Sequence, residues 1–109
     1  MSREQNLAQA AAATLERHIR LAILQLLAGQ PMGNASDVVL YEALGAMGHP
    51  VSRDAVRAHI FLLGTLGLIQ VLDLRASTGL VGATLSEKGS DVAKGRSFVA
   101  GVEPALQGG

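Results

Sequence analysis

The sequence predicts a small α+β domain that is mainly helical, with a three-helix core, one β-hairpin and a C-terminal helix. Apolar residues recur at intervals of three and four before residue 67, which is the spacing of one helix face. Two short apolar runs, 68–74 and 80–85, then flank a Gly-containing turn, the pattern of a hairpin. A third helical stretch follows the hairpin.

Composition limits the class of protein. The 109 residues suffice for one domain, and 49% apolar with 17% charged residues is typical of a globular chain. No run reaches the ~18 apolar residues of a membrane span. The opening residues lack the pattern of a signal peptide, so we expect a cytoplasmic protein of the bacterial host cell. We expect the folded domain over residues 1–95 and a Gly-rich, apolar, docked tail over residues 96–109.

The first helix is expected over residues 5–28. Between Ile19 and Ala28 only two residues are polar, so this half is apolar around most of its circumference and is buried on more than one side. One side faces the core, and we expect the other to face a second subunit in a homodimer. The expected interface residues are Leu15, Ile19, Ala22, Ile23 and Leu26. The alternative is that the hairpin and tail of the same chain cover this helix.

A second helix is expected from about Ser36 to Met47, after a loop around Pro31. Asn34 with Asp37 three residues later resembles a capping arrangement for its start. Pro50 follows a Gly-containing turn. A helix, a tight turn and another capped helix form a helix-turn-helix pattern.

The third helix begins at Ser52, which suits an N-cap, and ends at Gly67, which tolerates left-handed geometry. Its apolar face is expected to include Ile60. After it, Leu68–Leu74 and Leu80–Leu85 are the two hairpin strands. A short helix capped by Ser86 is expected to reach about Lys94.

A capped helix that continues through LGLI into a hairpin resembles the recognition helix and wing of a winged-helix domain. The segments RLAILQLLA, LYEALGAMGHPVSRDAVRAHI, LGLIQV, LSEKGSDVAKGR and VAGV are similar to a family of small winged-helix proteins of Mu-like bacteriophages and prophages. The resemblance extends from about Ile19 to Val102. It implies a three-helix winged domain of phage origin and no established target. Members are often named as ArsR-like, but metal-sensing ArsR regulators use Cys thiolates, and this chain has none.

In a helix-turn-helix protein, the first turns of the recognition helix face the DNA major groove. We therefore expect contacts with double-stranded DNA from Ser52, Arg53, Arg57, His59 and, at the tip of the wing, Arg75. The alternative is that these arginines only solvate the surface, with Asp54 as a candidate ion-pair partner of Arg57. Nine basic and nine acidic residues give no net charge, which weakens the case for DNA because cations supply most non-specific affinity.

Phe61 and Leu62 fall outside the apolar row of the third helix. They either close the core or mark a protein-binding patch. The histidines lack metal-ligand spacing, and no catalytic or phosphate-binding motif is present, so we expect no metal, no cofactor and no enzyme. The sequence thus favours a dimeric DNA-binding transcriptional regulator, with a protein–protein interaction module as the alternative.

Overall fold

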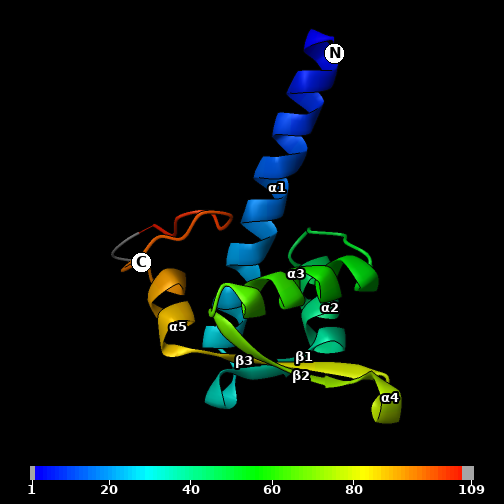
Figure 1. Ribbon diagram of the computed structural model, residues 1–109, viewed down its shortest axis with the longest axis vertical. Helices are drawn as coiled ribbons and strands as arrows, with labels where there is room; N and C mark the ends of the chain where they lie inside the picture. Colours follow the sequence, from blue (N-terminus) through cyan, green and yellow to red (C-terminus); the bar gives the residue numbers. More distant parts are fainter. Residues whose placement is uncertain (1, 107–109) are drawn as a thin grey trace.

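The computed structural model describes residues 2–106, in which the four longer helices lie on one side of an antiparallel sheet (Figure 1). The elements are α1 (Arg3–Ala28), a 3-10 turn (Pro31–Gly33), β1 (Asn34–Ser36), α2 (Asp37–Ala46), α3 (Arg53–Thr65), β2 (Ile69–Leu74), α4 (Arg75–Thr78), β3 (Leu80–Leu85) and α5 (Glu87–Ala93). The mixed α+β class is therefore confirmed. No helix among the described residues is long and apolar enough to cross a membrane.

Serine side chains define where the helices begin. Ser36, Ser52 and Ser86 each accept a hydrogen bond from the backbone N–H three residues later, at the starts of α2, α3 and α5. Two of these caps agree with the predicted ones. The capping role expected for Asn34 is wrong, because Asn34 lies in β1 and its amide donates to the Thr84 hydroxyl (2.7 Å).

The sheet has the strand order β1-β3-β2, and both pairs are antiparallel. In this register Ala35, Ala83 and Val71 share the face toward the helices. The opposite face carries exposed side chains such as Gln70 and Leu72. The hairpin strands agree with the predicted ranges, whereas β1 was not predicted. The predicted turn contains the short helix α4, which Gly79 ends with a φ of 73°.

One core lies between the helices and the sheet. It contains Ile23, Leu24 and Leu27 of α1, Leu40 and Leu44 of α2, Val56, Ile60 and Leu63 of α3, Val81 and Ala83 of β3, and Val92 of α5. Leucine, isoleucine and valine side chains supply its volume, since the chain has few aromatic residues. The C-terminal half of α1 thus lies in the centre of the domain and contacts both α2 and α5.

The segment after α5 folds back on α1. The Glu103 N–H donates to the Arg17 carbonyl (3.2 Å), and Val102 and Ala105 are buried. Phe98 and Leu106 remain exposed. Residues 107–109 of the expected tail lie outside the described residues. This segment covers part of the apolar surface of α1 within a single chain, which is the alternative that the sequence left open.

Candidate functional site

A buried carboxylate connects α2, α3 and the hairpin. Asp37 is fully buried, and its Oδ2 accepts hydrogen bonds from Arg53 Nε (3.0 Å) and Arg57 Nε (2.7 Å). Its Oδ1 accepts the N–H of Val81 in β3 (3.0 Å). Both arginines also donate from Nη2 to the carbonyl of Gly79 at the hairpin turn. We call Asp37, Arg53, Arg57 and the Gly79 carbonyl the Asp37 cluster.

The electrostatics of this cluster favour the ionised carboxylate. Burial by itself raises the pKa of Asp37, but the hydrogen bonds from the Val81 N–H, Arg57 and Arg53 outweigh it and lower that pKa to about 2. Asp37 therefore carries a full negative charge at neutral pH, and it offsets part of the positive charge that Arg53 and Arg57 bring to the surface.

The arginine of the hairpin tip is also paired. Arg75 donates to Asp73 from Nε (2.9 Å) and Nη2 (2.7 Å), and its guanidinium lies 5.1 Å from the centre of the Phe61 ring. The side-chain hydrogen bond from Arg75 lowers the pKa of Asp73 to about 2. Arg75 thus bends over α3 and does not extend freely from the tip.

His59 lies on the inner side of α3. It is 8% exposed, and its Nδ1 accepts a hydrogen bond from Arg20 Nε of α1 (3.1 Å). Arg20 also donates to the Gly101 carbonyl (2.9 Å) and pairs with Glu16. Burial, then the charge of Arg20, lowers the pKa of His59, so the imidazole is neutral at pH 7.

The predicted DNA contacts therefore occupy different environments. Ser52 is exposed and caps α3, while Arg53 and Arg57 keep side-chain exposures of 41% and 21%. The expectation for His59 is corrected, because it points toward α1 and is covered by its own chain. The negative partners Asp37 and Asp73 were missed. From the sequence, Asp37 was interpreted only as part of a helix cap. The position of Asp73, two residues before Arg75, could have predicted their ion pair.

The expected subunit interface also needs correction. Ile19, Ala22 and Ile23 are 3%, 5% and 0% exposed within a single chain, so they have no surface left for a second subunit. Leu26 is half-buried against the core, whereas Leu15 is 52% exposed. The homodimer itself stays a prediction.

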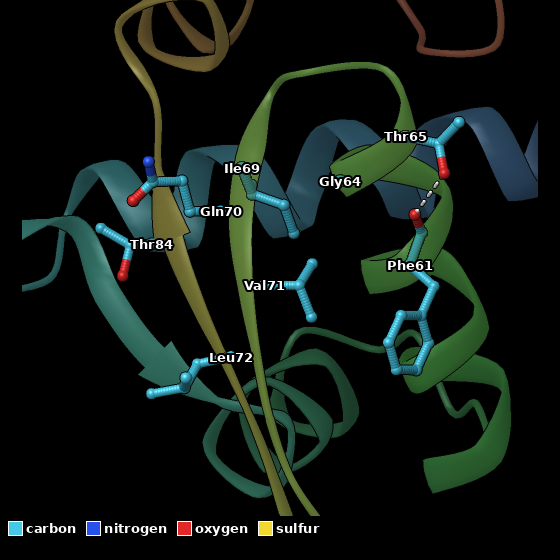
Figure 2. A pocket seen from close by; sticks show the side chains of 8 residues that line it. All are labelled: Phe61, Gly64, Thr65, Ile69, Gln70, Val71, Leu72 and Thr84. Atoms are coloured by element: carbon cyan, nitrogen blue, oxygen red, sulfur yellow. Dashed lines mark hydrogen bonds between the residues drawn. The ribbon is translucent and has the colours of Figure 1, made fainter.

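An open groove follows β2, the edge strand, beside α3 and reaches residues on both faces of that strand (Figure 2). It is lined by Phe61, Gly64 and Thr65 of α3, Ile69, Gln70, Val71 and Leu72 of β2, and Thr84 of β3. The helix approaches the strand closely here, since a Cβ atom on Gly64 would lie 2.7 Å from Val71 Cγ2. The lining contains no charged residue. Such a groove suits an apolar or uncharged polar group of a binding partner.

Among residues 2–106 no group of three or more histidine and carboxylate side chains could hold a metal ion.

Comparison with known proteins identifies a relative from a bacteriophage. Models of known protein families give no match, and no solved structure matches the chain. The chain is 45% identical over 69 residues to gp26 of Escherichia phage Mu, whose description is "uncharacterized protein". The matched region covers 63% of this chain and 69% of the phage Mu protein. The chain therefore belongs to the same family as gp26 of phage Mu and is a Mu-like phage protein.

Proposed function

We propose that this fold is a winged helix-turn-helix. Its order of helix, short strand, two helices and a hairpin supports this, as does the placement of the β3 strand between β1 and β2. In this interpretation α3 is the recognition helix and the β2–β3 hairpin is the wing. Winged helices bind DNA or proteins, so the fold alone does not decide the partner.

We propose further that the domain is a protein–protein interaction module of a Mu-like phage. The observation that carries this proposal is the pairing of all three arginines of α3 and the wing with carboxylates of the same fold. From Asp37 to Leu80 the chain has three arginines against four acidic residues and no lysine. A surface without excess positive charge lacks the main source of affinity for a phosphate backbone.

Apolar exposure on the same elements supports a protein partner. α2, α3 and β2 expose six large apolar side chains, which are Val39, Tyr41, Leu62, Leu72, Leu74 and, at the C-cap of α2, Met47. The neutral groove beside β2 adjoins Leu72. Binding surfaces for proteins are commonly apolar at the centre with few charges, and this composition fits them better than it fits nucleic acid.

Sequence-specific DNA binding by a transcriptional regulator is the second candidate. It is favoured by the position of Arg53 and Arg57, which lie together near the start of α3 beside the wing. Within residues 2–106 the hydrogen bonds of both guanidiniums come from Nε and Nη2, so the two Nη1 hydrogens of each arginine remain for a base edge or a phosphate. In this candidate the Asp37 cluster orients the arginines.

Two measurements separate the candidates. First, fluorescence anisotropy with a pool of random duplexes at low and physiological salt reports DNA binding. We expect no salt-dependent signal and no difference between the wild type and Arg57→Ala. Binding that weakens with salt, with a slope reduced by about one in Arg57→Ala, would overturn the interaction-module proposal.

Second, a photoreactive residue in place of Gln70 reports a protein partner in cells that produce the phage. We expect a discrete protein adduct that Leu72→Asp abolishes. Phe98→Asp is the matched control, since Phe98 is 62% exposed, similar to Leu72 at 60%, but lies after α5. Equal adducts in both variants would exclude the groove as the binding site.

A further inference from the structure

The N-terminal part of α1 projects from the domain without covering anything (Figure 1). Every residue from Arg3 to Ala13 is exposed, including Leu7 at 63%. Ser2 and Gln5 form a capping box at the start of the helix, and the alanine run has high helix propensity. A helical segment of this length is still marginal in water without tertiary contacts. Its stability therefore benefits from a partner.

One face of this segment is self-complementary. With 3.6 residues per turn, Glu4, Leu7, Ala11, Leu15 and His18 lie along one stripe of α1. Leu7 and Leu15 are four residues on either side of Ala11, and Glu4 and His18 are seven residues on either side. A second copy in antiparallel orientation, centred on Ala11, would therefore place Leu7 on Leu15 and Glu4 beside His18, twice over. The small Ala11 side chain at the centre allows the two helices to approach closely.

The base of the same stripe opens into a hollow on the domain. It is lined by His18, Leu21, Gln25, Glu103, Pro104 and Leu106. Leu106 is 91% exposed at its edge. In the antiparallel arrangement, the first turn of the second copy arrives beside this hollow. Its Arg3 then approaches Glu103, whose side chain forms a 3.7 Å ion pair with Arg17 within the described residues, so the charges of the two ends are complementary.

We propose that the N-terminal half of α1 is a homodimerisation element that pairs antiparallel with a second copy of this chain about Ala11. The interface is isologous, with each Leu7–Leu15 contact occurring twice and each hollow receiving the partner's first turn. From Glu4 to His18 the paired helices overlap over about 21 Å. This surface shares Leu15 with the interface that the sequence predicted but not the other four residues, because the buried C-terminal half of α1 forms the core of each subunit and the exposed half joins the two.

Sedimentation velocity of the full chain at tens of micromolar measures its oligomeric state directly. We expect a dimer for the wild type and a monomer for Ala11→Glu, which places two carboxylates at the symmetry centre. Ala13→Glu is the matched control: the same substitution in the same exposed run, on the opposite side of the helix. We expect it to remain a dimer. A monomeric wild type, or a dimer that survives Ala11→Glu, would overturn the proposal.

Disulfide trapping tests the orientation, because the chain has no cysteine of its own. In an antiparallel pair centred on Ala11, only the central position faces its own copy within the Cα separation of about 4.4–6.8 Å that a disulfide requires. Ala11→Cys should therefore cross-link to itself, whereas Leu7→Cys should not. Leu7→Cys mixed with Leu15→Cys should give the heterodimer. Self-linking of Leu7→Cys as efficient as that of Ala11→Cys indicates a parallel pair and refutes the geometry.

Discussion

Replacement of Asp37 by asparagine gives the sharpest test of how the fold is held together. Asp37→Asn keeps the size of the side chain but removes the charge that Arg53 and Arg57 both contact. A fall of the pKa from 3.8 to about 2 corresponds to about 2 kcal/mol of preference for the ionised side chain in the folded state. The amide also presents N–H donors where only acceptors are needed. We therefore expect a loss of about 2–3 kcal/mol at pH 7.

Urea denaturation followed by circular dichroism measures this loss. With a slope of about 1 kcal/mol per molar urea for a domain of this size, the midpoint should fall by about 2–3 M. The control is Glu42→Gln in the same helix, because Glu42 is exposed, and we expect a change within about 0.5 kcal/mol. Equal midpoints for Asp37→Asn and the wild type would refute the role of this carboxylate.

The pH dependence gives a second, independent check on Asp37. The folded-state pKa lies below the unfolded value, so the stabilisation is complete above about pH 4 and is lost as the pH falls toward 2. The stability gap between the wild type and Asp37→Asn should close over this interval. A gap that is as large at pH 2 as at pH 7 would mean that shape rather than charge makes the difference.

Two further predictions concern the helix contacts. Gly89→Ala should destabilise the fold by about 3 kcal/mol or more, because a Cβ atom at this position would overlap the Leu68 carbonyl. Gly45→Ala should stabilise the fold by about 0.5 kcal/mol, because a Cβ atom there would meet open space and alanine favours the helix. Thermal melting of the two variants compares these effects. Because the pKa of His59 is lowered in the folded state, the stability that neutral His59 contributes is present above pH 6.5 and is lost as the pH falls below that value. The urea midpoint of His59→Gln should therefore change less between pH 7.5 and 5.5 than that of the wild type. The same pH dependence in both proteins would contradict the burial of the imidazole.

Local chemistry made much of the fold predictable. Ser52 and Ser86 were identified as helix starts because a short polar side chain directly precedes an apolar periodic run. Gly67 and Gly79 mark chain reversals, and both adopt a positive φ. β1 was not predicted because its three residues are too few to show the alternation of apolar and polar residues that indicates a strand. Its existence depends on β3, some fifty residues away.

The site was less predictable for a related reason. The positions of Arg53 and Arg57 on α3 follow from the helix period, but the partner that neutralises them lies on another helix. Nothing in the spacing of Asp37 distinguishes a buried ligand of two arginines from an ordinary first-turn acid. In the same way, the apolar circumference of α1 does not reveal which side its own chain covers. Ile23 is fully buried in the part of α1 that packs between α2 and α5, and neither helix is near it in the sequence.

The Asp37 cluster has a consequence for the kinetics of recognition. The carboxylate holds the start of α2, the start of α3 and the turn of the hairpin in one network, so these three segments cannot reorient separately without leaving a buried charge unpaired. A partner then meets a preformed surface, and little conformational entropy is lost on contact. We expect association to be single-step, at about 10⁵–10⁷ M⁻¹s⁻¹, with differences in affinity between variants arising in the dissociation rate.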